Sequence, residues 1–353
     1  MDGNRRRGLG GSGIMVSPLA MGCWSFGGGA YWGKQSRRDE REVVASALDH
    51  GLNLFDTAEM YNGGASEEAL GRALAGRRSE AVIASKISPA NAYREEMIAC
   101  CEASLRRLKT DYLDVYMLHW PLNRRSVAHF TADERKIASP PAITEAMEAM
   151  AQLKADGKIR AAGVSNFGVK QLREAAQTGV RIDINEITYN ILSRAIEAAV
   201  LPYCRDHGVS VLASMTLAQG LLAGLYSTPE AVPPSQAHSR HFAQARGGTA
   251  SRHGGGGYED LVFSALADLK TIAAQNALSL PQMAIAWLIS RPGVTAALVG
   301  SRSAGELAQN RTALDVRLSQ AVMNRIDRAS LDLLNAMGSD PDYYENSGNS
   351  RIW

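Results

Sequence analysis

The sequence predicts an α/β protein built as a (β/α)8 TIM barrel, with an N-terminal β-hairpin before the barrel and an extra C-terminal helix after it. Eight short apolar runs alternate with segments of helical periodicity, and strict β-α alternation argues for a parallel sheet. Eight such units in 353 residues match a closed barrel of ordinary size. An open, doubly wound sheet is the alternative, but no predicted strand leads into the G-x-G-x-x-G turn of a dinucleotide fold.

The predicted elements follow one another at short intervals. A hairpin over residues 8–18 precedes the first core strand. Ser66 is predicted to cap the helix after the second strand, and Gly51, Gly157 and Gly179 close predicted helices. The core strands are expected at 19–23, 52–55, 81–85, 112–118, 159–164, 182–187, 209–213 and 294–299, and the main helices at 39–50, from 66 onward, and at 93–108, 142–155, 169–177, 196–207, 260–276, 281–289, 304–313 and 319–336.

Residues 1–353 are predicted to form a single domain, although two segments interrupt the alternation. Residues 121–141 are polar and end in a Pro-Pro pair, and residues 227–257 are rich in Gly, Pro, Ser, Arg and His. A long connection without structure of its own is either functional or disordered. Both follow a strand, on the side where barrel active sites are built. We expect 227–257 to be a mobile loop and 319–353 to form a C-terminal helix and tail.

The composition excludes several function classes. Residues are 45% hydrophobic and 21% charged, and the formal net charge is +2, so no strong field favours nucleic acid or an anionic membrane as a partner. No apolar run reaches the length of a membrane span, and no signal peptide is recognised. The four cysteines have no metal-ligand spacing. The sequence therefore predicts a reduced, cytoplasmic protein without a metal site, and it does not indicate an oligomeric state.

Polar side chains stand where the second, third and fourth predicted strands end. Asp56, Lys86 and His119 each follow an apolar run, and Tyr61 comes five residues after Asp56. Because the carboxyl ends of barrel strands converge on one mouth, we expect these groups to meet. Asp56 can pair with Lys86, and a lysine cation beside a phenol lowers the pKa of that phenol. Tyr61 is therefore a candidate proton donor, and His119 could orient a carbonyl oxygen or share the proton.

With a metal site and a catalytic nucleophile excluded, the chemistry that these residues can perform is proton delivery to an oxyanion. No serine or cysteine is set beside a base as a nucleophile. Delivery of that proton needs a partner step that generates the oxyanion, such as transfer of a hydride.

Five motifs then occur in a characteristic order and spacing. They are GLNLFDTAEMY at 51–61, VIASK at 82–86, DYLDVYMLHWP at 111–121, GVSNF at 163–167 and LVGSRSAGELAQN at 298–310. With these motifs the chain resembles the aldo-keto reductases over essentially its whole length. The resemblance implies a barrel that binds a nicotinamide cofactor without a Rossmann fold. It also implies that an aldehyde or ketone is reduced, or the matching alcohol oxidised, with Asp56, Tyr61, Lys86 and His119 as the catalytic tetrad.

The resemblance also implies a set of cofactor contacts, with two departures from the family pattern. Glu186 stands where relatives usually have a glutamine that binds the carboxamide. Ser214 stands where relatives often stack a tyrosine on the nicotinamide. The implied cofactor-binding residues are Ser165, Asn166, Glu186, Ser214, Leu217, Gln219, Gly220, Gly300, Ser301, Arg302, Glu306, Gln309 and Asn310.

The choice of nicotinamide cofactor depends on two side chains near the last helix. Arg302 suits a 2′-phosphate. Glu306 would disfavour that phosphate, or would bind the ribose hydroxyls of NAD instead. We expect NADP, with NAD as the alternative.

The sequence gives less information about the substrate pocket than about the cofactor site. Trp24, Trp32 and Trp120 are expected to wall a pocket for a small-molecule carbonyl or alcohol, and a sugar or other polyhydroxylated carbonyl is the preferred class. A second hypothesis is a nicotinamide-binding regulatory subunit with little turnover, which Glu186 and Ser214 keep open. A cofactor-free barrel hydrolase or isomerase does not explain the motif at 298–310.

Overall fold

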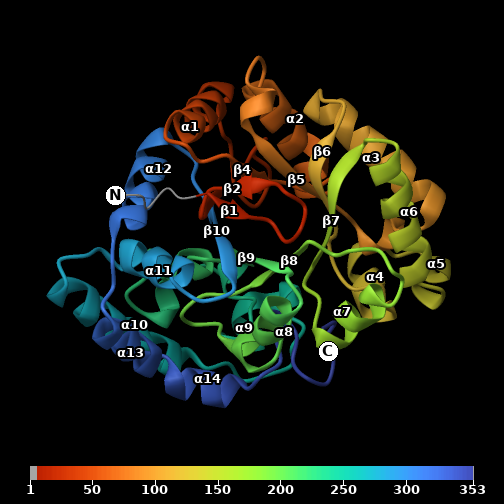
Figure 1. Ribbon diagram of the computed structural model, residues 1–353. Coiled ribbons are helices and arrows are strands. Elements are labelled where there is room, and N and C mark those ends of the chain that lie inside the picture. The colour runs from red at the N-terminus through yellow and green to blue at the C-terminus, as the bar shows by residue number, and fades with distance from the viewer. Residues whose placement is uncertain (1–5, 353) are drawn as a thin grey trace.

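A computed structural model describes residues 6–352. At its centre eight parallel strands close into a barrel in the order β10-β3-β4-β5-β6-β7-β8-β9, and the helices surround it (Figure 1). The closed parallel barrel confirms the predicted fold class. The barrel strands are β3 (Leu19–Gly22), β4 (Leu54–Asp56), β5 (Val82–Ile87), β6 (Leu113–Leu118), β7 (Ile159–Ser165), β8 (Ile184–Thr188), β9 (Ser210–Ser214) and β10 (Val294–Gly300).

The helices follow the strands as the alternation predicts, with several additions. The main helices are α1 (Arg37–Asp49), α2 (Ala65–Ala73), α3 (Arg94–Leu108), α6 (Ile143–Ala155), α7 (Val169–Ala176), α8 (Val200–Asp206), α10 (Glu259–Gln275), α11 (Leu280–Ile289), α12 (Ala304–Arg311), α13 (Gln320–Ala329) and α14 (Leu331–Met337). Shorter helices lie in the two long connections: α4 (Arg124–Phe130), α5 (Glu134–Ala138) and α9 (Gln244–Gly247).

The predicted N-terminal hairpin is present and closes the floor of the barrel. It pairs β1 (Arg7–Gly8) with β2 (Met15–Val16) in antiparallel fashion. Leu9, Ile14 and Val16 join the cluster of apolar side chains inside the barrel. Gly10 has a φ of +52°, and a Cβ there would lie 2.4 Å from the Asp183 carbonyl oxygen. The hairpin therefore seals the end opposite the strand termini that carry the predicted site.

Two local predictions differ from the structure. Ser66 does not cap α2, because Gly64 occupies that position and the Ser66 hydroxyl instead bonds the Cys23 carbonyl oxygen at 2.7 Å and the Thr57 hydroxyl at 2.8 Å. The single helix predicted at 319–336 is divided into α13 and α14 at Ser330. There Arg194 Nη1 donates to the Ser330 hydroxyl at 3.1 Å and to the Asp327 carbonyl oxygen at 2.7 Å. Contacts with residues far away in the sequence therefore determine both the role of Ser66 and the break between α13 and α14.

The segment 227–257 is folded against the rest of the chain. It contains α9 and short 3-10 turns, and Val232, Phe242 and His253 are among its buried side chains. The backbone N–H of Arg240 donates to the Tyr343 carbonyl oxygen at 3.1 Å, which ties the segment to the C-terminal tail. That this segment is mobile, and that the chain is a single domain, stay predictions.

Among the described residues, no single helix is long and apolar enough to cross a membrane. The pair α10 and α11, which meet at a bend of 92°, satisfies the requirement of length and composition only when the two helices are taken together.

The close packing of α2 on α3 yields a test of the fold. A Cβ on Gly71 would lie 2.5 Å from the Leu108 carbonyl oxygen, which is backbone and cannot rotate away. We expect Gly71→Ala to lower the free energy of unfolding by about 1–3 kcal/mol, because the clash outweighs the better helix propensity of alanine. Gly305→Ala in α12 is the control, since its nearest atom is 3.8 Å away. Urea denaturation of both variants checks this, and equal stabilities would contradict it.

Candidate active site

The ammonium group of Lys86 is the centre of the barrel mouth. Lys86 lies on β5, is fully buried, and its Nζ is 2.6 and 2.7 Å from the two carboxylate oxygens of Asp56, the last residue of β4. The same Nζ is 3.1 Å from the Thr57 carbonyl oxygen and 3.2 Å from the Tyr61 hydroxyl. The predicted pairing of Asp56 with Lys86 is confirmed, and Tyr61 lies within hydrogen-bond distance of the same cation.

The loop after β4 places Tyr61 by a local backbone constraint. Asn62 has a φ of 51°, in the left-handed region that asparagine tolerates. Its side-chain amide donates to the carbonyl oxygens of Trp24 at 3.0 Å and Phe26 at 2.8 Å. These bonds fasten the loop to the segment after β3. The Tyr61 ring therefore has a fixed position 5.9 Å from the ring of Trp24.

The pKa of Tyr61 is shifted in the direction opposite to the expectation. Burial raises the pKa of its phenol above the ordinary value, and although the Lys86 cation opposes the shift, Asp56 and Glu186 reinforce it. The expected lowering of this pKa takes only the lysine into account, and it is wrong because burial outweighs the lysine. At neutral pH Tyr61 is consequently a neutral phenol, the form that can donate a proton.

His119 follows β6 and completes the group. Its ring lies edge-on to the Tyr61 ring with the centroids 5.7 Å apart. Burial, and then the charge of Lys86, hold the imidazole pKa well below its usual range, so the ring is neutral. Its Nδ1 is buried and has no hydrogen-bond partner. A neutral imidazole beside Tyr61 is able to orient a carbonyl oxygen.

A second carboxylate, Glu186 on β8, also faces Lys86. Its Oε2 lies 3.3 Å from Lys86 Nζ, and the side chain is buried. Burial, and then the charge of Asp56, raise the carboxyl pKa well above its ordinary value. The sequence predicts a cofactor contact for Glu186 at the end of its strand, but it does not predict the ion pair with Lys86.

The remaining predicted cofactor residues lie at the ends of β7, β9 and β10. Asn166, with a φ of 61°, donates to the His119 carbonyl oxygen at 3.1 Å and to the Ser165 hydroxyl at 3.0 Å. Ser214 ends β9, and Gly300 ends β10. The others lie in the turn after β9 (Leu217, Gln219, Gly220), before α12 (Ser301, Arg302) and within α12 (Glu306, Gln309, Asn310).

These residues fit a bound nicotinamide dinucleotide. Gln219 has a φ of 53°, and its buried Oε1 has no hydrogen-bond partner. Left-handed backbone at residues other than glycine is typical of ligand-binding turns. Asn310 donates to the Ser301 hydroxyl at 3.1 Å beside the N-terminus of α12, where the backbone favours an anion. Among residues 6–352 no group of three or more His, Cys, Asp or Glu side chains is placed to hold a metal ion.

Comparison with known proteins assigns the family. The sequence model of the Aldo/keto reductase family matches residues 18–331. The chain belongs to this family. It is therefore an oxidoreductase that uses NADPH or NADH to reduce an aldehyde or ketone, or to oxidise the matching alcohol.

Individual relatives match along most of their length. Methylglyoxal reductase YeaE of Escherichia coli is 31% identical over 318 residues, which cover 90% of this chain and 92% of the relative. An NADH-specific methylglyoxal reductase of the same organism is 31% identical over 333 residues, covering 89% and 94%. A solved aldo-keto reductase from Klebsiella pneumoniae in complex with NADPH has a TM-score of 0.69 at 31% identity, covering 92% of this chain and 94% of that one.

In this aldo-keto reductase the segment after β3 runs between the tetrad and the cofactor residues. Trp24 stacks on Tyr31 with ring centroids 5.2 Å apart, and Trp32 meets both rings edge-on. Gln219 Nε2 donates to the Tyr31 hydroxyl at 3.1 Å, and Arg302 donates to the Lys34 carbonyl oxygen at 2.7 Å. The aromatic loop therefore contacts the predicted cofactor site and also adjoins Tyr61.

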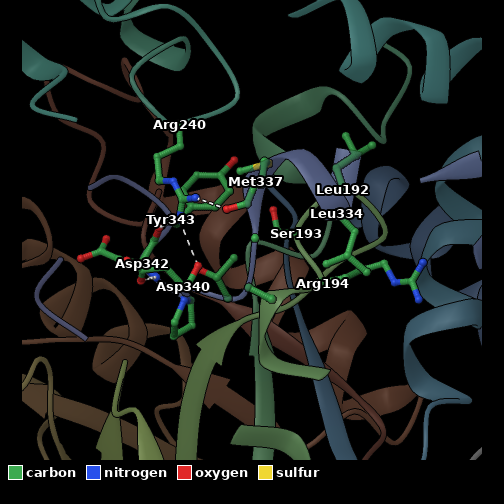
Figure 2. Close-up of a pocket in the computed structure, with 13 residues that line it drawn as sticks. Leu192, Ser193, Arg194, Arg240, Leu334, Met337, Asp340, Asp342 and Tyr343 are labelled. Atoms are coloured by element: carbon green, nitrogen blue, oxygen red, sulfur yellow. Dashed lines mark hydrogen bonds between the residues drawn. The ribbon is translucent and has the colours of Figure 1, made fainter. Parts of the chain in front are cut away.

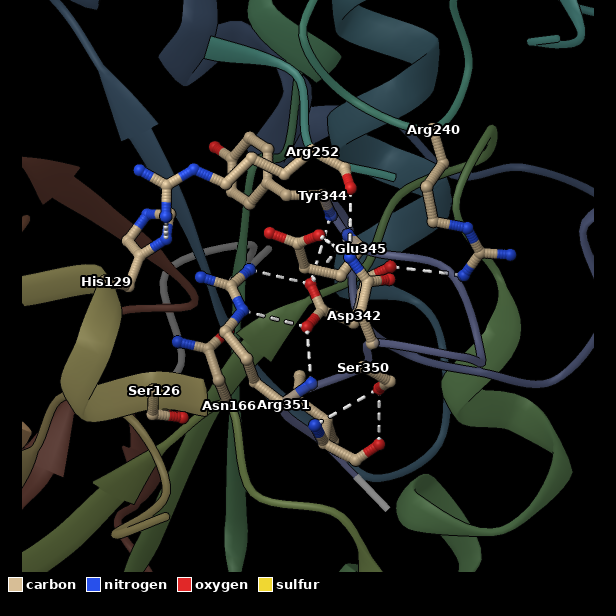
Figure 3. A network of polar contacts seen from close by, with 12 residues as sticks. Ser126, His129, Asn166, Arg240, Arg252, Asp342, Tyr344, Glu345, Ser350 and Arg351 are labelled. Atoms are coloured by element: carbon tan, nitrogen blue, oxygen red, sulfur yellow. Dashed lines mark hydrogen bonds and ion pairs between the residues drawn. The ribbon is translucent and has the colours of Figure 1, made fainter. Parts of the chain in front are cut away.

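The C-terminal tail covers Trp120, a contact that the sequence does not indicate. The Arg351 guanidinium lies 3.7 Å from the ring centre of Trp120 and pairs with Asp342 through two bonds of 3.0 and 2.7 Å (Figure 3). Asn123 donates to the Arg351 carbonyl oxygen at 3.0 Å. Arg351 is almost fully buried. Trp120 is consequently covered by the tail, while Trp24 adjoins Tyr61 and Trp32 packs on Trp24.

A small cavity lies beside the C-terminal tail, and an arginine in its wall anchors the tail. Thr188, Arg194, Arg240 and Tyr343 are among its lining residues (Figure 2). Arg240 donates to the carbonyl oxygens of Met337, Asp340 and Asp342. This cavity contains no member of the tetrad, so we assign it a structural role.

The buried ion pair of the tail can be tested by stability. Asp342→Asn leaves the Arg351 cation buried without its counter-charge, and breaking such a pair costs about 3–5 kcal/mol. We expect a clear fall in the denaturant midpoint, together with weaker carbonyl turnover because Trp120 loses its cover. Asp133→Asn is the control, because its partner Arg135 is 93% exposed. The assignment fails if both variants unfold like the parent protein.

Proposed function

We propose that this chain is an NADP-dependent carbonyl reductase in which Tyr61 donates the proton. The observation that carries the proposal is the buried Lys86 ammonium, held by Asp56 at 2.6 Å and placed 3.2 Å from the Tyr61 hydroxyl. A cation in a site shielded from water stabilises the phenolate that forms as the proton leaves. The tetrad geometry therefore supports protonation of a carbonyl oxygen lying between Tyr61 and His119.

The roles of the tetrad follow from its charges. The nicotinamide, when bound, supplies the hydride that is added to the carbonyl carbon. Tyr61 is a neutral phenol, so its proton is available to the oxygen. His119 is neutral and orients the same oxygen through its ring nitrogen. In the direction of alcohol oxidation, Tyr61 takes the proton back while Lys86 stays charged.

NADP is the proposed cofactor because a cation, Arg302, lies before α12, where the adenosine end would bind. Arg302 is only partly buried, and its guanidinium suits a phosphate. Glu306 is already engaged, since it accepts the backbone N–H of Arg302 at 2.8 Å. The Klebsiella relative, solved with NADPH, supports this choice, and the NADH-specific relative keeps NAD as the alternative. Ser165, Asn166, Gln219, Ser301 and Asn310 would hold the rest of the cofactor.

The proposed substrate is a small aldehyde or ketone. The ring of Trp24 lies beside Tyr61 and packs with Tyr31 and Trp32, and the covered Trp120 directly follows His119 in the chain. Aromatic faces accept flat carbonyls and the apolar faces of sugars. Two relatives are named for methylglyoxal reduction, which favours short aldehydes. Polyhydroxylated carbonyls belong in the same assay panel.

Replacing the proposed proton donor tests the mechanism. We expect Tyr61→Phe to lower kcat by about a hundred- to ten-thousandfold, because the ring remains and only the donated proton is lost. NADPH binding, followed by tryptophan fluorescence, should change little. Tyr112→Phe, before the start of β6, is the control and should keep full turnover.

Two outcomes would count against the proposal. Robust turnover by Tyr61→Phe would remove Tyr61 from the chemistry. Tight NADPH binding by the unmodified protein without turnover across a broad carbonyl panel would favour the regulatory-subunit alternative.

The cofactor preference has a separate test at the adenosine end. Glu306→Gln removes a negative charge near the expected 2′-phosphate, and we expect NADPH to bind about two- to fivefold more tightly while NADH affinity stays constant. Titrations with both cofactors measure this. Asp268→Asn, an exposed acid on α10, should change neither affinity. A variant that gains NADH affinity instead would show that Glu306 does not face the 2′ position.

A further inference from the structure

Three buried charged groups meet at the mouth of the barrel. Asp56, Lys86 and Glu186 are 4%, 0% and 5% exposed. Lys86 Nζ is 2.6 Å from Asp56 and 3.3 Å from Glu186. Within residues 6–352, Lys86 is the sole cation that pairs with either carboxylate. If both acids were ionised, this cluster would have two negative charges and one positive charge in a site shielded from water.

The neighbouring elements do not compensate for the second negative charge. The buried thiol of Cys23, the residue after β3, faces Asp56, and Tyr61 and His119 face Lys86. On the strands beside β8, Ser165 and Leu212 lie in register with Glu186, and neither bears a charge. An unbalanced buried charge costs several kcal/mol, and a neighbouring like charge makes one carboxylate keep its proton.

We propose that Asp56 and Glu186 share one proton, so that the three groups are together neutral and Glu186 serves as a carboxylic acid beside the Lys86–Asp56 pair. Asp56 keeps the negative charge because it contacts Lys86 with both oxygens, at 2.6 and 2.7 Å. Glu186 approaches Lys86 with one oxygen, at 3.3 Å. Burial raises the pKa of both carboxyls, and the contacts with Lys86 assign the proton to Glu186.

The shared proton controls the acidity of Tyr61. A second negative charge beside Lys86 opposes the phenolate that forms as Tyr61 donates its proton, whereas a neutral Glu186 does not. The carboxyl pKa values are raised in the folded protein. The proton is therefore bound at low pH and is lost as pH rises through the apparent pKa of the pair. The rate of carbonyl reduction is therefore highest below that pH and falls above it. This consequence rests on Tyr61 being the donor, whereas the shared proton itself does not.

Infrared spectroscopy of the protein without cofactor tests the shared proton directly. We expect the C=O stretch of a protonated carboxylic acid at neutral pH, and we expect Glu186→Gln to remove it because Asp56 alone then balances Lys86. Glu67→Gln is the matched control: Glu67 is also buried, but it pairs with Arg107 at 2.6 Å, so the band should persist. If Glu186→Gln does not fold, glutamate labelled at its carboxyl carbon identifies the band in the unmodified protein. The absence of a band that shifts with this label, at neutral pH, overturns the proposal.

The pH dependence of kcat at saturating cofactor tests the consequence. In the unmodified enzyme the rate of reduction should fall about tenfold per pH unit above the apparent pKa of the pair. The pH profile of Glu186→Gln should lack this falling limb at high pH. A limb that is identical in both proteins would overturn the role of Glu186. If Tyr61→Phe still turns over while the infrared band is present, Tyr61 is not the donor and the shared proton stands.

Discussion

The site is organised around a fully buried ammonium. Removing Lys86 Nζ from water costs several kcal/mol, and the cost is offset because Asp56 contacts it with both oxygens and the Thr57 carbonyl accepts a further hydrogen bond. Burial disfavours the charged form of Lys86, but the Asp56 carboxylate, with Glu186 and Tyr61 adding to it where they are ionised, outweighs burial and raises the pKa of Lys86. Lys86 therefore stays a cation throughout the physiological range, which makes it a permanent electrostatic partner for Tyr61.

The barrel supplies the rigidity that this arrangement needs. Asp56, Lys86 and Glu186 lie on three different strands of one closed sheet. Their separations are fixed by strand pairing, since the neighbouring β4 and β5 are in register from Leu54 with Val82 to Asp56 with Ala84. The floor is filled by apolar side chains and sealed by the N-terminal hairpin. Water therefore reaches the charged cluster from the mouth, where the aromatic loop and the C-terminal tail restrict access.

The features that could be predicted from the sequence are those encoded locally. The closed barrel follows from the alternation of eight strands with helices, and the group Asp56, Lys86, Tyr61 and His119 follows from polar residues at or just after the ends of apolar runs. Arg351 could not be found this way, because its partner Trp120 lies more than two hundred positions earlier and no periodicity marks the pairing. Ser66 was misread for a related reason: its sequence context suits a helix cap, yet a buried hydroxyl is held by Cys23 and Thr57 instead.

The protonation of Tyr61 shows why a single neighbour does not determine a pKa. Lys86 alone would lower it, as the sequence argument assumed, but burial dominates and two carboxylates reinforce burial. The net effect on Tyr61 depends on how many of those carboxylates are ionised. Glu186 is the carboxyl group whose charge changes with pH, because Asp56 contacts Lys86 with both oxygens and stays ionised. A glutamine at position 186 could be neutral only, whereas a glutamate makes the charge beside the proton donor depend on pH, and the same barrel thereby acquires a titratable control on its own chemistry.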